Sequence, residues 1–462
     1  MYEESNTIKN LCEKLWNFER ENNLFDIVIK EVYIWEIVRF NVYSELSRVQ
    51  GFYDDAHRYN NRLIDKIKKV PIKLLNITFK NPMFGSYKRD FLIYDHPRKV
   101  RFERKNIDIY TESFIQNQDK RTFDIIEPSY TGKYFPNNLQ VNRKSRDFER
   151  LSEILKKKVS SLKINNNEKI MIRKIEKKLC EYFDVNNIDF YNLIINHLEK
   201  FLYRFEYHKK IMKKREPKSI YIVVSYSNFP IIAAAKDLGI EVIEFQHGVI
   251  TRYHFAYNFS DPSKVLKYFP DKILTFGEYW GKTEGFPKQT KIEVCGFPYL
   301  NLQLEKFKGT HKKKNQILFI SQGTIGKELS KRAKEVAIGM PDYHFIYKLH
   351  PGEYDRWRNE YPDLVEASNL DHFEVIDHND RNLYSLFAES DYQVGVCSTA
   401  IFEGLTLNCK TVLFNLPGIE YMNDLICQGI VQVVHNKEEA INCIKNYELK
   451  DFSRDYFFKK EK

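Results

Sequence analysis

The sequence contains no long hydrophobic run. Nowhere among its 462 residues do about eighteen apolar residues follow one another, although a helix that spans a membrane needs about that length. The chain also does not open with the basic and apolar regions of a secretory signal. We therefore expect no membrane-spanning helix, and we expect a protein of the cytoplasm.

Cysteine is scarce and shows no pairing pattern. CxxC and CxxH spacings are typical of zinc sites and of thiol redox centres. The seven cysteines form neither spacing. Their odd number, and the apolar or helical surroundings of Cys397, Cys409 and Cys427, favour reduced core thiols. We therefore expect a reducing compartment, no metal site and no cofactor.

Several motifs of nucleotide and nucleic-acid proteins are absent as well. The chain has neither GxGxxG nor GxxxxGK[ST], which excludes the usual dehydrogenase and P-loop fingerprints. No RNP, helix-turn-helix or zinc-finger pattern accompanies the net charge of +10, so we expect no nucleic-acid partner. The basic residues gather in runs instead. Such runs are typical either of solvated helix faces or of attraction to an anionic membrane surface.

What is present is typical of a large globular α/β protein. Hydrophobic residues make up 43% of the chain, with 30 Tyr and 34 Phe, which excludes a disordered chain. A chain of this length is expected to form two domains. Residues 1–80 carry apolar side chains at three- and four-residue intervals, which predicts a helical N-terminal segment.

The next part of the chain predicts an N-terminal domain at 81–305. Its short apolar runs predict strands at 91–95, 107–110, 123–127, 220–224, 241–245 and 272–277. A charged stretch without strand pattern, 145–216, predicts a helical insertion. Within it, one helical face from 192 to 215 is apolar, and we expect this stripe either to pack in the core or to meet a membrane surface. Its residues are Ile195, Leu198, Leu202, Phe205 and Ile211.

A basic linker at 306–314 precedes a regular second half. From 315 to 440 strand and helix patterns alternate strictly, and this predicts a parallel, doubly wound sheet. A C-terminal helix or tail is expected at 441–462. The fold class is therefore α/β, with two Rossmann-like parallel-sheet domains that face a cleft.

One polar loop follows the apolar run 344–347. Because ligands of open α/β sheets bind outside the carboxyl ends of the strands, we expect this loop to line the cleft. It offers Lys348 and His350, and Pro351 and Gly352 make a sharp exit from the strand. Both side chains are candidates for stabilising the negative charge that grows on a phosphate leaving group. The alternative is a solvated lysine and a histidine that caps a turn.

A second polar loop follows the apolar run 392–396. Ser398 and Thr399 begin a helix there, and Glu403 lies about one turn further on. The exposed amides of a helix start bind phosphate, and the carboxylate suits the hydroxyl groups of a ribose. We therefore assign all three to donor binding. A turn after the first strand of this half is the remaining donor-binding candidate, and it contains Gln322, Gly323 and Thr324.

The N-terminal half offers a candidate base. His247 follows a predicted strand, and Gly248 allows close approach of the backbone. In this position a histidine can accept the proton of an attacking hydroxyl group. Arg252 and Tyr253 follow and are candidates for acceptor binding. Asp95, at the end of the first strand, is a further acceptor-site residue and a rival base.

These residues together resemble bacterial surface-glycan glycosyltransferases of the GT-B architecture. The group includes capsule and lipopolysaccharide transferases of the sialyl and Kdo type, and the CDP-glycerol glycerophosphotransferases. The resemblance covers roughly residues 220–425. It is carried by His350-Pro351 as the HP element, Ser398-Thr399 as the hydroxyl pair, Glu403 as the acidic residue of the donor helix, and Gln246-His247-Gly248 as the His-Gly element.

The resemblance implies a nucleotide-activated sugar, preferably of cytidine type, as donor. It implies a glycan or a lipid-linked molecule as acceptor, no metal, and an enzyme peripheral to the inner face of the cell membrane. Phe245-Gln246 stands where the glycerophosphotransferases have an aromatic Trp before the histidine, and the sialyl-type Asp-Asp-Gly element is missing. The transferred group therefore stays open between a sugar and a polyol phosphate. A non-catalytic glycan-assembly protein or a sugar-nucleotide 2-epimerase would share the same fold, so both interpretations stay open too.

Overall fold

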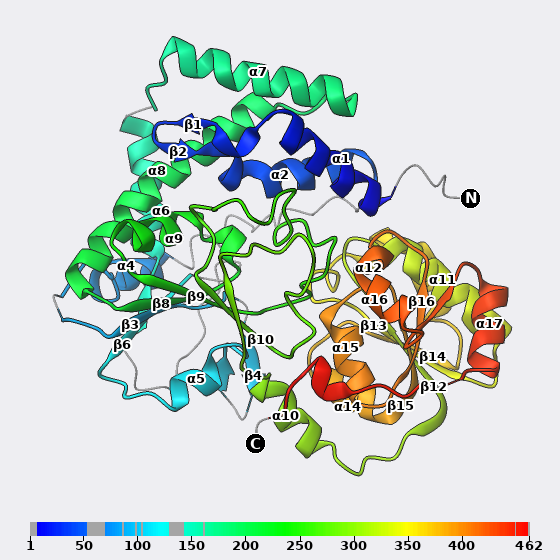
Figure 1. Cartoon of the computed structure of the whole chain (residues 1–462). Helices are drawn as coiled ribbons and strands as arrows, with labels where there is room; N and C mark the ends of the chain where they lie inside the picture. The colour runs from blue at the N-terminus through cyan, green and yellow to red at the C-terminus, as the bar shows by residue number, and fades with distance from the viewer. Residues whose placement is uncertain are drawn as a thin grey trace.

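The computed structural model describes residues 7–52, 70–85, 87–97, 99–102, 105–128, 143–159, 162–448 and 450–460. Two sheets dominate this part of the chain, one from the N-terminal half and one from the C-terminal half (Figure 1). Every strand pair within these two sheets is parallel. The structure thereby confirms the expected α/β class with two Rossmann-like domains.

Among the described residues, the N-terminal sheet contains seven strands, most of them at the predicted positions. In sheet order they are β11 (Lys291–Val294), β10 (Lys272–Thr275), β9 (Glu241–Phe245), β8 (Ser219–Val223), β3 (Phe91–Tyr94), β6 (Phe123–Glu127) and β7 (Arg143–Ser145). The strand predicted at 107–110 is wrong. Asp108 accepts hydrogen bonds from the backbone amides of His96 and Tyr110, at 2.8 and 3.0 Å, and so turns the chain. Only β5 (Lys105–Ile107) is extended there, paired with β4 (Val100–Phe102) outside the main sheet.

The C-terminal sheet contains six strands, and its alternation with helices follows the prediction. In sheet order the strands are β14 (Phe373–Ile376), β13 (His344–Lys348), β12 (Lys313–Ile320), β15 (Ser390–Gly395), β16 (Lys410–Phe414) and β17 (Gln432–Val434). The helices used below are α11 (Gly326–Gly339), α14 (Leu383–Glu389), α15 (Thr399–Thr406) and α17 (Lys437–Lys445). The central strands β12 and β13 are buried over most of their length, which explains their nearly continuous apolar sequence.

Three helices form the predicted insertion, namely α6 (Asp147–Val159), α7 (Asn166–Phe183) and α8 (Phe190–Arg215). The apolar stripe of α8 packs in the core, since Leu198 and Ile211 are fully buried. Its alternative interpretation as a membrane-facing stripe is therefore wrong, because α2 (Ile34–Val49) and α9 (Phe229–Asp237) pack on α8. No helix in the described ranges is both long enough and apolar enough to cross a bilayer.

In the described parts of the N-terminal segment, 7–52 and 70–80, helices predominate, and one short hairpin interrupts them. The helices are α1 (Ile8–Glu21), α2 and α4 (Val70–Phe79), and the hairpin of β1 (Val28–Ile29) and β2 (Val32–Tyr33) lies between α1 and α2. Lys30 and Glu31 at its tip both have positive φ, the geometry of a tight hairpin turn. The helix expected across residues 53–69 lies outside the described residues.

A buried ion pair anchors this segment to the rest of the molecule. Arg39 donates to Glu19 at 2.9 Å and to the carbonyl oxygen of Asn258 at 3.0 Å. Its guanidinium also lies 3.9 Å from the ring centre of Phe255 and 4.2 Å from that of Phe259. Because a buried guanidinium is stable only with such partners, α1 and α2 hold the long loop that follows β9.

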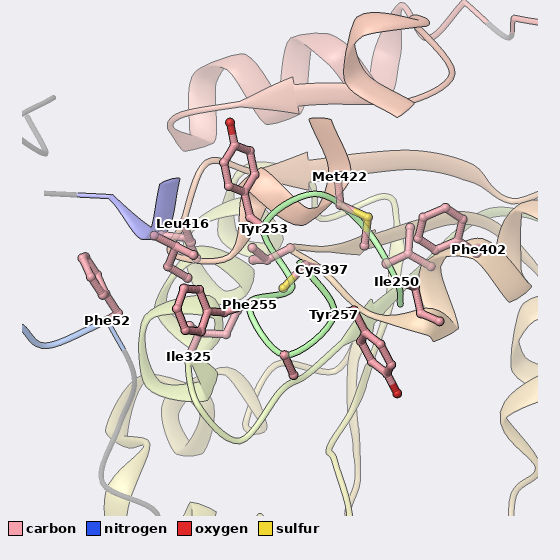
Figure 2. Packing of buried hydrophobic residues seen from close by; sticks show 14 of the residues in the cluster. Phe52, Ile250, Tyr253, Phe255, Tyr257, Ile325, Cys397, Phe402, Leu416 and Met422 are labelled. Atoms are coloured by element: carbon pink, nitrogen blue, oxygen red, sulfur yellow. The ribbon is translucent and has the colours of Figure 1, made fainter. Parts of the chain in front are cut away.

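The two halves share one hydrophobic cluster. Figure 2 shows Ile250, Tyr253 and Phe255 of the loop after β9 among Cys397 and Met422 of the C-terminal half. The C-terminal tail also returns to the N-terminal sheet. The indole of Trp280 donates to the carbonyl oxygen of Phe457 at 2.7 Å, and the ring of Phe458 stacks on Phe276. The C-terminal helix is expected from residue 441. The observed helix, α17, begins four residues earlier, at Lys437.

Candidate active site between the two sheets

The turn after β9 presents His247. Gln246 is buried, and its side chain accepts from the backbone amide of Phe276 and donates to the carbonyl oxygen of Gly248, both at 2.8 Å. These two bonds fix the turn on either side of His247. Nε2 of His247 lies 3.3 Å from the hydroxyl oxygen of Tyr226, so the imidazole has a defined orientation.

Three neighbouring strands contribute to the surroundings of His247. Tyr226 follows β8, which pairs with β9, and His96 follows β3, which lies on the far side of β8. The ring centres of His96 and Tyr110 lie 6.5 and 6.4 Å from that of His247. Sequence reasoning assigned no role to His96 or Tyr226, although the rule that selected His247, a polar residue at the carboxyl end of a parallel strand, selects them as well.

The loop after β13 holds His350 in one orientation. The backbone amide of Gly352 donates to Nδ1 of His350 at 3.1 Å. A ring nitrogen that accepts a hydrogen bond carries no proton, so the proton of the neutral imidazole lies on Nε2. His350 is thereby prepared to donate a hydrogen bond from Nε2, for instance to a phosphate oxygen.

Lys348 lies beneath this loop. Its ammonium group donates to the carbonyl oxygens of Leu349 and His378, both at 3.1 Å, and to the hydroxyl oxygen of Tyr354 at 2.5 Å. Burial lowers the pKa of Lys348 to about 8. The bond to His378 ties β13 to the loop after β14, and the other two stay within the loop after β13. The assignment of Lys348 to the donor phosphate stays a prediction, and such a contact would have to replace one of them.

Glu353 organises the same loop, and sequence reasoning missed it. Its carboxylate is fully buried and accepts from the backbone amide of His350 at 2.6 Å, from Ser321 at 2.8 Å and from Tyr361 at 3.0 Å. Burial raises the pKa of Glu353. It connects the His350 loop to the end of β12. No spacing rule selects a glutamate three residues after a histidine, so only the fold identifies it.

We expect Glu353→Ala to lower the free energy of unfolding by about 3 kcal/mol, because it leaves buried donors on Ser321, Tyr361 and His350 without an acceptor. Urea unfolding measures the change. The matched control is Glu366→Ala, whose carboxylate is 68% exposed and pairs with a surface lysine. It should cost less than about 1 kcal/mol. Equal losses for both variants would contradict the assigned role.

The turn after β12 is joined to the second loop. The side-chain oxygen of Gln322 accepts from the backbone amide of Cys397 at 3.3 Å. The carbonyl oxygen of Gly323 accepts from Arg356 at 2.5 Å, and Thr324 is exposed to solvent. The structure therefore brings Gln322 next to the loop that leads into α15, as a donor pocket requires.

The start of α15 faces the N-terminal half. Ser398 is its N-cap and accepts from the backbone amide of Ala400 at 3.1 Å. The position that a Cβ atom would take on Gly248 lies 3.5 Å from the hydroxyl oxygen of Thr399. The loop that carries His247 and the helix start that carries the Ser-Thr pair therefore meet directly, although they are far apart in the sequence.

Glu403 lies one turn into α15 and is 9% exposed. Burial raises the pKa of its carboxyl group to about 7, and a hydrogen bond with Tyr384 opposes the increase. Tyr299 packs against Tyr384 with a ring-centre distance of 5.8 Å. A buried carboxyl group beside the phenol of Tyr384 is suited to accept hydrogen bonds from hydroxyl groups of a ligand.

The residues assigned to the acceptor have other contacts. Arg252 is exposed and forms an ion pair with Glu284. Tyr253 is buried, and its ring lies 6.3 Å from that of Trp16 in α1. Their contact with an acceptor stays a prediction. Because Tyr253 is buried, it would contribute to acceptor binding only by holding the conformation of the loop.

Asp95 lies in a buried cluster of charges. Its carboxylate forms ion pairs with Lys99 and, at 2.8 Å, with Arg143. Although burial alone would raise its pKa, these cations and a hydrogen bond with Asp108 hold the pKa of Asp95 well below its usual range. A carboxylate with so low a pKa is a weak proton acceptor, and His247 is the better candidate.

Metal ligands are not grouped in the part of the chain that the structure describes. No cluster there contains three or more His, Cys, Asp or Glu side chains in positions to hold an ion. The groups that could face a phosphate at this site are hydrogen-bond donors, namely His350 and the first amides of α15. Helix N-termini bind phosphate through such amides.

Comparison with known proteins gives structural neighbours only. No family model and no curated protein match the chain. UDP-GlcNAc 2-epimerase from Methanocaldococcus jannaschii is 12% identical, with 80% of this chain and 96% of that chain covered and a TM-score of 0.47. MurG from Acinetobacter baumannii is 12% identical over 78% and 90%, with a TM-score of 0.42. The wall teichoic acid polymerase TagF is 10% identical over 84% and 89%, with a TM-score of 0.39. At this level the neighbours assign neither a substrate nor an activity to this chain.

Proposed function

We propose that the protein is a metal-independent GT-B glycosyltransferase, which moves a sugar from a nucleotide-activated donor to a glycan or lipid-linked acceptor in capsule or lipopolysaccharide biosynthesis. The observation that carries the proposal is the direct approach of Gly248, next to His247, to Thr399 at the start of α15. A candidate base from one sheet and a phosphate-binding helix start from the other thus share one site, as transfer between two substrates requires.

The donor is assigned to the C-terminal half. The amides at the start of α15 and the Nε2–H group of His350 are donors for the phosphate oxygens. Glu403 is the acceptor for the ribose hydroxyl groups. These N–H groups stabilise the negative charge that develops on the phosphate when its bond to the sugar breaks. They therefore stabilise the transition state more than the bound nucleotide sugar. A cytidine nucleotide is preferred because of the HP and Ser-Thr resemblance.

The acceptor is assigned to the N-terminal half. His247 takes the proton of the acceptor hydroxyl group while the oxygen of that hydroxyl group attacks the anomeric carbon of the sugar. The nucleotide leaves with the electron pair of the broken bond. Tyr226 orients the imidazole through its contact with Nε2. A polyol-phosphate transferase is the second candidate, because the His-Gly turn held by Gln246 would serve attack at phosphorus equally well.

We expect a nucleotide panel to identify the donor. Ligands that bind only the folded protein raise its melting temperature, and at equal concentration a tighter ligand raises it more. At equal concentrations CMP or CDP should raise it more than UDP, GDP or ADP, as measured by differential scanning fluorimetry. Equal shifts with UDP or GDP would remove the cytidine assignment. No shift with any nucleotide would favour a non-catalytic protein, and the Glu403→Gln variant controls for binding elsewhere.

A further inference from the structure

Helix α4 is folded with its apolar side outward. Its buried side chain is the polar Asn76, which donates to Asp147 of α6 at 2.9 Å. The leucines Leu74 and Leu75 are 57% and 56% exposed, and Phe79 is 78% exposed. A surface helix normally turns its apolar face to the core and its polar face to water. The orientation of α4 departs from this arrangement.

The neighbouring helix α6 continues the same character. Leu151, Ile154 and Leu155 are exposed on it. The two helices lie side by side at the edge of the N-terminal sheet, joined by the Asn76–Asp147 bond (Figure 1). Exposed apolar side chains that gather on neighbouring elements mark interaction sites on many proteins.

The charges of the two helices have one sign at the surface. α4 contains no acidic residue. The three acidic residues of α6 are all buried, and two of them are paired, Glu149 with Arg146 at 2.6 Å and Glu153 with Arg204 at 2.8 Å. Three consecutive lysines, 156–158, end α6, and the first and third are exposed. The exposed charged residues of α4 and α6 are therefore all cationic, beside the exposed apolar side chains.

We propose that the outward faces of α4 and α6 dock onto an anionic phospholipid bilayer. The leucine, isoleucine and phenylalanine side chains enter the boundary between headgroups and acyl chains, and the lysines contact the acidic headgroups. An apolar helix face with cations at its border matches such a surface in both polarity and charge. The site lies on α4 and α6 and uses none of the residues proposed for transfer, so it stands or falls independently of the proposed function.

The experiment is co-sedimentation of the full chain with two kinds of vesicle. One is phosphatidylcholine alone, and the other is phosphatidylcholine with about 30% of the anionic lipid phosphatidylglycerol. We expect binding to the anionic vesicles, weakened at high salt. The double variant Leu74→Asp with Leu75→Asp should lower the binding constant by more than about tenfold. Its matched control is Val265→Asp with Ile338→Asp, at positions that are 66% and 62% exposed on other elements, and it should bind like the unmodified chain.

A second pair of variants separates charge from apolar contact. Lys156→Glu with Lys158→Glu should lower binding to the anionic vesicles by about tenfold and leave binding to phosphatidylcholine unchanged. Lys327→Glu with Lys331→Glu, also exposed, on α11, is the control. Equal binding of all variants, or equal loss in a variant and its control, would overturn the proposal. So would sedimentation velocity in which the chain self-associates through Leu74 and Leu75 without binding vesicles, since the patch would then join two copies.

Discussion

Replacement of His247 by alanine is expected to lower the turnover number by about 10²- to 10⁴-fold, with little change in donor affinity. The reason is that His247 is assigned only to the acceptor proton, and loss of a general base acts on the chemical step. Turnover is measured as release of nucleotide from the sugar donor at saturation, and affinity by calorimetry with the free nucleotide.

The control for this variant is His311→Ala, an exposed histidine in the linker between the sheets. It should leave both quantities unchanged. If His247→Ala weakens nucleotide binding while turnover at saturation survives, His247 is a phosphate ligand instead of a base. That result would not make Asp95 a stronger candidate for the general base, because the ion pairs with Lys99 and Arg143 keep its pKa low.

Replacement of His350 or of Glu403 by alanine is expected to abolish transfer, a loss of more than about 10³-fold, with the fold intact. Both side chains are assigned to the donor, and the bond from Gly352 to Nδ1 of His350 leaves the ring proton on Nε2. Donor affinity should fall with Glu403→Ala, because its carboxylate is assigned to the ribose. The assays belong at pH 8, since Glu403, with a pKa of about 7, is then ionised.

Matched variants separate this role from structure. His344→Ala removes an exposed histidine at the opposite end of β13 and should be without effect. Glu403→Gln keeps the size of the side chain but not the charge, so it should weaken nucleotide binding and remove the decrease in affinity that we expect as the pH falls through about 7. Near-normal turnover of His350→Ala or of Glu403→Ala would show that the donor assignment is wrong.

Local sequence patterns by themselves determined much of the fold of this protein. The apolar runs that end in polar loops predicted the parallel strands β9, β13 and β15. A strand that is buried on both faces consists almost entirely of apolar residues, so its sequence is easy to recognise. The same runs placed His247, His350 and Ser398 at carboxyl strand ends, where the structure has them. The strand at 107–110 failed because the side chain of Asp108 takes the amides of a turn.

Only the tertiary structure decided what lies beside these elements. An apolar stripe has the same periodicity whether a protein core or a membrane covers it, so the sequence could not distinguish α8, which is buried, from α4, which is exposed. Glu353 and Gln322 act through partners on other strands, and the approach of Gly248 to Thr399 joins two domains. Contacts between residues far apart in the chain leave no regular spacing, because the folded path alone brings those residues together.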